Sequence, residues 1–140
     1  MANTLYNIAR LKFLTEGIHW ENHTIKCCLV TTTPGGYSFV ATEENMTAVS
    51  AKIVDGQIEA LTTSTTALGA ADAADVTFTG VTASADAIEA LVIYQENDAG
   101  DQSLNIPIAY IDSATGLPIT PNGGDIIVTW DSGDNRIFRL

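Results

Sequence analysis

The last third of the chain, Leu104–Leu140, constrains the fold more than any other stretch. Three short apolar runs, Leu104–Asp112, Asp125–Asp131 and Arg136–Leu140, are separated by the turn-forming sequences SATGLP, PNGGD and DSGDN. β-branched and aromatic residues suit a pleated, half-buried surface, and clusters of Gly, Pro, Asn and Asp mark the turns between strands. The pattern predicts antiparallel strands, and the apolar final residue Leu140 predicts a docked C-terminal end.

Four further strands are predicted upstream, at Thr24–Thr33, Tyr37–Ala41, Asp75–Val81 and Ala87–Gln95. Ala87–Gln95 is apolar on both faces, which is typical of a central strand. Pro107 cannot donate a backbone hydrogen bond, so its strand is expected to contain a bulge or to lie at a sheet edge.

Three connecting segments have signatures of their own. Asp55-Gly56 lies between two apolar runs in Ala51–Leu61 and predicts a type I′ hairpin turn, because both positions tolerate positive φ. The small and polar residues of Thr62–Asp75 predict a surface crossing or a loop that reaches toward a partner. Thr42 followed by Glu43 and Glu44 predicts the cap and first turn of a short helix.

Asn3–Gly17 is the best candidate for a helix. Apolar residues recur at intervals of three, with Asn3 or Thr4 as a cap and Gly17 as a stop. The apolar stripe consists of Leu5, Ile8, Leu11 and Leu14, with Ala9 and Phe13 beside it. Such a face predicts packing against a sheet opening or a neighbouring subunit.

The composition fits a single domain covering residues 1–140. Of these 140 residues, 46% are hydrophobic and 16% are charged, which is enough apolar material for one core. The sequence has no repeat of solenoid period and no linker. We therefore expect a mainly β fold, a small antiparallel β-sandwich or barrel with one N-terminal α-helix.

The charge excludes two classes of partner. A net charge of −11 with 6 Lys and Arg residues disfavours nucleic acid, since counterion release needs a basic surface, and it disfavours anionic membranes for the same reason. No apolar stretch approaches the roughly 18 residues of a spanning helix, and no signal peptide is evident. We expect synthesis in a reducing cytoplasm, with the adjacent Cys27 and Cys28 as buried small hydrophobes.

No constellation of catalytic or metal-binding residues stands out, so the expected catalytic, cofactor and metal sites are none. The sequence has no GxSxG, P-loop, GxGxxG or HExxH motif. His19 and His23, which flank Trp20, are interpreted as loop residues rather than metal ligands. Glu89, in an apolar run, is expected at the polar face of a sheet; the alternative is a buried acid with a raised pKa. An enzyme is the weakest of the hypotheses.

The acidic turns allow two interpretations. Glu96–Gln102, Asp112–Gly116, Asn122–Asp125 and Asp131–Asn135 contain oxygen ligands suited to Ca²⁺, but none has the spacing of an EF-hand loop. Local hydrogen bonding and tolerance of unusual dihedral angles already explain Asp, Asn, Ser and Gly in turns. Turns are therefore favoured over calcium sites.

The C-terminal IAYIDSATGLPITPNGGDIIVTWDSGDNRIFRL, preceded by EALVIYQ, resembles a family of small virion structural proteins of tailed bacteriophages. The opening ANTLYNIARLKFLTEGIHWENHTIKCCLV is similar to that family's helix followed by a strand. The likeness covers nearly the whole chain and is strongest from Ala87 onward.

This resemblance implies a non-catalytic capsid cement or decoration protein that sits on the outer shell of the virion and binds the major capsid protein, with a homotrimer favoured. Leu5, Tyr6, Ile8 and Phe13 are the candidate residues for the oligomer or capsid contact. A head–tail connector or tail component is the alternative within this class. A different class, a carbohydrate-binding β-sandwich, would use the acidic turns with Tyr37, Tyr94 and Trp130 as exposed aromatic residues.

Overall fold

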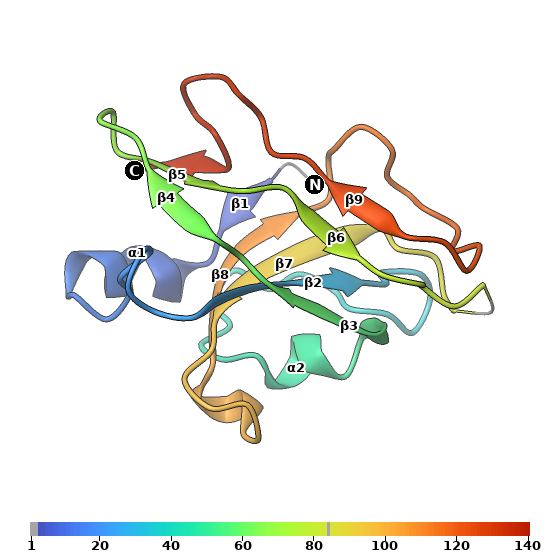
Figure 1. Cartoon of the computed structure of the whole chain (residues 1–140). Helices are drawn as coiled ribbons and strands as arrows, with labels where there is room; N and C mark the ends of the chain where they lie inside the picture. The colour runs from blue at the N-terminus through green and yellow to red at the C-terminus, as the bar shows by residue number, and fades with distance from the viewer. Residues whose placement is uncertain (1–2, 84) are drawn as a thin grey trace.

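The computed structural model describes residues 3–83 and 85–140 (Figure 1), and these residues form a mainly β domain with an N-terminal helix. A five-stranded antiparallel sheet has the order β1-β8-β7-β2-β3. Its strands are β1 (Thr4–Leu5), β8 (Ile106–Ile111), β7 (Ala90–Gln95), β2 (Ile25–Val30) and β3 (Ile53–Ala60).

The centre of this sheet is the centre of the core. Every residue of β7 is buried, as expected for a strand that is apolar on both faces. It pairs with β2 without interruption from Ile25 opposite Gln95 to Val30 opposite Ala90. Cys27 and Cys28 lie on opposite faces of β2 and are both fully buried, which confirms their predicted role as small core residues.

A second layer crosses one face of the five-stranded sheet (Figure 1). It consists of a three-stranded sheet, β10 (Phe138–Arg139), β5 (Ala70–Ala73) and β4 (Thr63–Thr65), and a pair, β6 (Val76–Phe78) and β9 (Ile126–Val128). Ala71, Val76 and Phe78 from this layer belong to the same core as the buried residues of β2 and β7. Of the two predicted arrangements the layered one applies, because none of the sheets formed by the described residues closes on itself.

The helices are shorter than predicted. α1 spans Asn7–Leu14, and Thr4–Leu5 form strand β1 instead of a first helical turn, because they pair with Tyr110 and Ala109 of β8. The other short elements are α2 (Thr47–Ser50) and the 3₁₀ turn η1 (Gln102–Leu104). The helix predicted to begin at Thr42–Glu44 therefore begins several residues later, at Thr47.

Two predicted connections and one predicted strand are wrong. Asp55 and Gly56 do have positive φ, 52° and 63°, but they form an irregularity inside β3, where its register against β2 shifts, and not a hairpin turn. Thr62–Asp75 is no surface crossing, since it contains the β4–β5 hairpin. Tyr37–Ala41 is not a strand.

Two features of the C-terminal third match the prediction. The β7–β8 register shifts between Ile93 and Tyr94, opposite Pro107, so the proline does lie at a bulge. The C-terminal end is docked through its backbone, because β10 pairs with β5 and the Leu140 N–H donates to the Gly69 carbonyl at 3.3 Å. The Leu140 side chain, in contrast, is 67% exposed.

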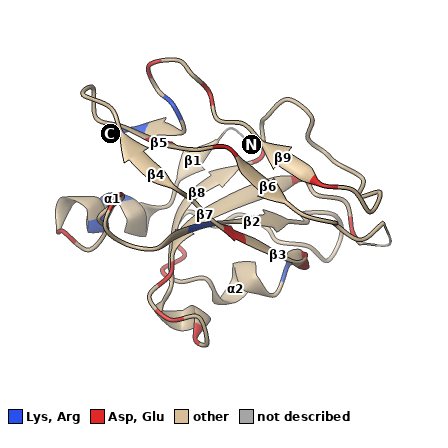
Figure 2. Cartoon of the chain, viewed as in Figure 1, with Lys and Arg blue, Asp and Glu red and all other residues tan. Residues whose placement is uncertain are grey.

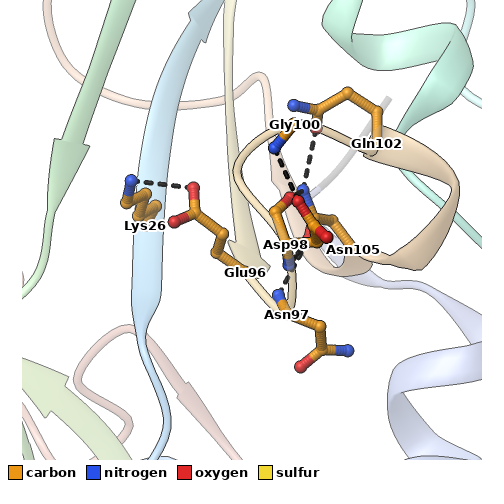
Figure 3. A network of polar contacts seen from close by, with 7 residues as sticks. All are labelled: Lys26, Glu96, Asn97, Asp98, Gly100, Gln102 and Asn105. Carbon is orange, nitrogen blue, oxygen red and sulfur yellow. Dashed lines mark hydrogen bonds and ion pairs between the residues drawn. The ribbon is translucent and has the colours of Figure 1, made fainter.

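Asn105 ties the loop between β7 and β8 into a fixed shape (Figure 3). Its buried Oδ1 accepts from the backbone N–H groups of Asn97 and Asp98, at 2.7 and 3.0 Å. Its Nδ2 donates to the Asp98 carbonyl at 2.9 Å and to Gln102 Oε1 at 3.1 Å. The side-chain amide thereby satisfies backbone groups that have no partner in either strand. At the loop's entrance, Lys26 and Glu96 form an ion pair at 2.7 Å.

We expect Asn105→Ala to lower the free energy of unfolding by about 1–3 kcal/mol, because the backbone groups of Asn97 and Asp98 lose partly buried hydrogen bonds. Asn122→Ala is the control, since exposed Asn122 makes one local bond, from the Gly124 N–H at 2.9 Å, and its loss should change stability by no more than about 0.5 kcal/mol. Urea unfolding of both variants measures the difference. Equal midpoints would show that the Asn105 network adds nothing to stability.

Candidate functional site: an arginine groove

The basic residues are unevenly distributed over an otherwise acidic chain. Of 6 Lys and Arg residues against 17 Asp and Glu, Arg10 and Lys12 lie on α1, and Arg136 and Arg139 lie in the C-terminal segment. Figure 2 shows the blue segments of α1 and of the C-terminal strand at one end of the molecule, while the red segments are scattered. Four of the six Lys and Arg side chains therefore lie in one region of the molecule.

This region contains a groove between the β1–β8 side of the large sheet and the C-terminal segment. It consists of two adjoining hollows of about 240 and 320 Å³ that share Asn3, Ile111 and Ile137 as lining residues. The first hollow is also lined by Leu5, Ala109, Tyr110 and Phe138, and the second by Leu91, Val128 and Trp130. Apolar and polar groups thus contribute about equally to the lining. We call the two hollows together the arginine groove.

Three arginines line this groove, Arg10 and Arg139 in the first hollow and Arg136 in the second, against one carboxylate, that of Asp131. Arg10 Nη1 donates to the Leu5 carbonyl at 2.8 Å and to Asn7 Oδ1 at 3.4 Å. Arg139 Nε donates to the Leu68 carbonyl at 3.0 Å. Within residues 3–83 and 85–140, neither Arg10 nor Arg139 forms an ion pair with a carboxylate.

Trp130 and Arg136, which line the second hollow, both have partners within the protein. Trp130 Nε1 donates to the Ala74 carbonyl at 3.1 Å, which fixes the half-buried indole at the wall. Arg136 Nε lies 3.7 Å from Asp72 Oδ2, so this arginine is partly neutralised. The strongest uncompensated positive charge therefore lies in the first hollow.

Two short strands beside the first hollow direct backbone groups away from their own sheets. The Tyr6 N–H donates to Ile108 and Thr4 pairs with Tyr110, so the intervening Leu5 directs its N–H and C=O away from β8. On β10, Phe138 pairs with Ala71 and Leu140 donates to Gly69, so the Arg139 backbone groups point away from β5. Exposed backbone groups of this kind can pair with another chain.

The candidate contact residues of the N-terminal segment separate in the structure. Leu5, Ile8 and Phe13 are half-buried against the core. Tyr6 must be corrected, because its side chain is fully buried and its hydroxyl lies 2.9 Å from that of Tyr37. The exposed apolar residues of α1 are instead Leu11, 53% exposed, and Leu14, 85% exposed.

These leucines lie near the C-terminal end of the chain. The rings of Phe13 on α1 and Phe138 on β10 are 5.8 Å apart, and exposed Leu140 follows two residues after Phe138. We define Leu11, Leu14 and Leu140 as the apolar end; Arg10 and Arg139 of the groove are their sequence neighbours. Exposed apolar side chains that gather on one part of a surface are typical of a contact with another protein.

The buried tyrosines form a structural cluster. Tyr37 donates to Glu43 Oε2 at 3.2 Å and shares a hydrogen bond with Tyr6. Burial raises the pKa of Tyr37 to about 12 and raises the pKa of Tyr6 and of Glu43 above their ordinary values. Phenols with such pKa values keep their protons at neutral pH, so they act here as hydrogen-bonding core groups.

The remaining titratable candidates have structural partners. His19 and His23 lie in a loop as predicted, and His23 Nδ1 is 2.7 Å from Gln95 Oε1. Glu89 is half-buried and accepts from the Thr32 N–H at 2.7 Å and its hydroxyl at 2.9 Å, so it fixes a loop. No group of three or more His, Cys, Asp or Glu suited to a metal occurs among the described residues.

In the acidic turn Glu96–Gln102, aspartate oxygen atoms accept hydrogen bonds from nearby residues. Asp101 Oδ1 accepts from the Ser103 hydroxyl and N–H at 2.6 and 2.9 Å, which lowers the pKa of this carboxyl group. Asp98 Oδ1 accepts from the Gly100 N–H at 2.7 Å. Such bonds account for Asp98 and Asp101 in this turn, as predicted. Asp125 differs, because its Oδ1 accepts from the Gly80 N–H at 2.8 Å, far away in the sequence.

The three aromatic residues suggested for a carbohydrate site do not form one. Tyr37 and Tyr94 are buried in the core, and Trp130 alone is half-exposed. That proposed site is therefore wrong as a set.

Comparisons with known proteins identify no relative: no family model, no curated protein and no solved structure matches the chain. Among the described residues, no helix has the length and apolar character that crossing a membrane requires.

The groove could not be deduced from any contiguous motif, because its arginines lie at opposite ends of the sequence. One signal was present. Four of the six cations occur within residues 10–12 and 136–139, which is improbable for a uniform surface.

Proposed function

We propose that this chain is a non-catalytic structural subunit of a tailed-bacteriophage particle, a capsid cement protein made in the host cytoplasm that binds the major capsid protein as a homo-oligomer. The sequence resemblance of the C-terminal third motivates the virion assignment. The observation that carries the docking role is the apolar end, where Leu11, Leu14 and Leu140 are exposed beside a basic groove.

Burial of such leucines against a partner supplies binding free energy. Covering one exposed leucine contributes roughly 1.5–3 kcal/mol. A cement protein needs modest affinity at each contact, because several subunits bind equivalent positions together and avidity raises occupancy. A three-fold oligomer would match the local three-fold axes of a shell.

We expect Leu11→Ser combined with Leu14→Ser to reduce occupancy on particles by at least about tenfold, since the variant loses the apolar contact but no core residue. The comparison is a mixed assembly with wild-type protein, followed by particle purification and quantitative mass spectrometry. Side-chain substitutions are preferable to a deletion of residues 1–6, because Tyr6 belongs to the core.

Ile127→Ser is the matched control, because Ile127 on β9 is 66% exposed and lies outside the apolar end. Its occupancy should equal that of the wild type. If the α1 double variant assembled as well as the Ile127 variant, the apolar end would not be the docking surface.

A further inference from the structure

We infer that the arginine groove binds an extended acidic segment of a partner polypeptide, which adds as a short strand beside β1 and β10. This inference deepens the proposed function and rests on its premise that the chain docks onto another protein. It names the chemistry of the docked segment: carboxylate side chains that alternate with apolar ones.

The first step concerns charge. Three arginines and one aspartate line the groove, although acidic residues outnumber basic ones by 17 to 6 over the chain. Selection for a solvated surface alone does not explain a local excess of arginine. A ligand with carboxylates would be complementary to this groove and repelled by the rest of the surface.

The second step concerns donors. A guanidinium group has five N–H donors in a planar fork. Arg139 uses Nε for the Leu68 carbonyl, and Arg10 uses Nη1 for Leu5 and Asn7. The other nitrogen atoms of both groups have no protein acceptor among the described residues. Their fork geometry suits bidentate binding of a carboxylate.

The third step concerns the backbone. Leu5 and Arg139 line the first hollow and direct their backbone N–H and C=O groups away from their own sheets, although the Leu5 carbonyl already accepts from Arg10. An extended peptide can pair with such groups, and its side chains then alternate between two faces. One face would meet the arginines, and the other would meet apolar lining residues such as Phe138 in the first hollow and Trp130 in the second.

The same observations disfavour a nucleic acid as the occupant. A long polyanion would extend beyond the groove over a surface whose net charge is −11, and it would be repelled there. A short acidic segment remains within the local positive field. The apolar residues of the lining also offer burial to valine or isoleucine side chains, which a sugar–phosphate backbone lacks.

The test is fluorescence anisotropy with a labelled peptide of alternating glutamate and valine, titrated with the intact protein. We expect saturable binding, weakened at least about tenfold by Arg10→Glu or by Arg139→Glu. Lys52→Glu changes the net charge equally at a basic residue outside the groove and should bind as the wild type does. A peptide of alternating lysine and valine should not bind.

Arg139→Lys distinguishes a loss of binding from misfolding, because lysine keeps the positive charge of Arg139 and lacks the planar fork of N–H donors. Intermediate affinity with an unchanged circular dichroism spectrum is expected. Equal affinity of the wild type, the Arg10→Glu variant and the Arg139→Glu variant would overturn the inference. So would equal binding of a single-stranded oligonucleotide. A self-association seen by sedimentation for the wild type and lost in both the Arg10→Glu and the Arg139→Glu variants would also overturn it, because the groove would then hold a second copy of this chain.

These results are separable from those for the proposed function. Peptide binding that depends on Arg10 and Arg139, without incorporation into particles, would support the groove chemistry and contradict the virion role. Incorporation into particles that requires Leu11 and Leu14, without peptide binding, would support the virion role and contradict the groove chemistry.

Discussion

Replacing Ile93 by alanine is expected to lower the free energy of unfolding by about 2–5 kcal/mol. Ile93 is fully buried in the middle of β7, between Cys27 of β2 and Ala109 of β8. Truncation removes apolar atoms from the core and leaves a cavity that the paired strands cannot close without breaking their register. Equilibrium unfolding in urea measures the change.

Ile127→Ala is the matched control for this substitution. The same atoms are removed, but Ile127 is 66% exposed on β9, so stability should change by no more than about 0.5 kcal/mol. Similar losses for Ile93 and Ile127 would contradict the assignment of β7 as the central strand of the core.

Alkaline pH is expected to destabilise the fold through its two buried thiols. Burial raises the pKa of Cys28 to about 12 and raises the pKa of Cys27 well above its ordinary value. The folded pKa values therefore exceed the unfolded ones, so the contribution to stability is complete below the ordinary thiol pKa. It is lost as the pH rises from about 9 toward the folded values.

Each thiol is expected to remove about 1.4 kcal/mol of stability per pH unit in this window. The buried phenols of Tyr6, Tyr37 and Tyr94 add to the loss in the same direction, because burial raises their pKa values too. Urea unfolding at about pH 8, 9.5 and 10.5 measures the slope. The variant with Cys27→Ala and Cys28→Ala is the control and should show a shallower slope, whatever its stability at neutral pH.

A stability that stayed constant up to about pH 10.5 would contradict this account, because it would require both thiols to ionise equally in the folded and unfolded states. An identical slope in the double alanine variant would assign the loss to the phenols alone.

Prediction from the sequence worked best where local pattern and tertiary environment agree. The run Ala87–Gln95 has Ile88, Val92 and Tyr94 on one face and Leu91 and Ile93 on the other, and β7 is buried on both faces. Pro107 has no N–H to donate, and the ladder is irregular opposite it. In both cases the chemistry of the residues alone limits the possible structures.

Prediction failed where one local backbone conformation is compatible with two different structures. Asp55 and Gly56 adopt positive φ, which a hairpin turn and an irregular strand both accept, and pairing with β2 decides between them. Likewise, apolar residues at intervals of three predict a helix that begins at Asn3. Thr4 and Leu5 instead form a strand, because they pair with β8. Leu11 and Leu14 then face solvent rather than the core.

The arginine groove is a third case, in which the residues that form a site are distant from one another in the sequence. Arg10 and Arg139 are separated by almost the entire chain, and no local pattern relates them. They line one hollow because β1 joins the edge of the large sheet and β10 joins β5 in the second layer. Only the tertiary arrangement of the two chain ends creates the site.

The most direct test of the proposed function is a cryo-electron map of tailed-phage particles assembled in the presence of this chain. The account predicts density for this fold on the particle, with the apolar end and the arginine groove turned toward a neighbouring subunit and an extended segment of that subunit beside β1 and β10. Particles without this density, or a bound subunit with α1 and the groove facing solvent, would contradict it.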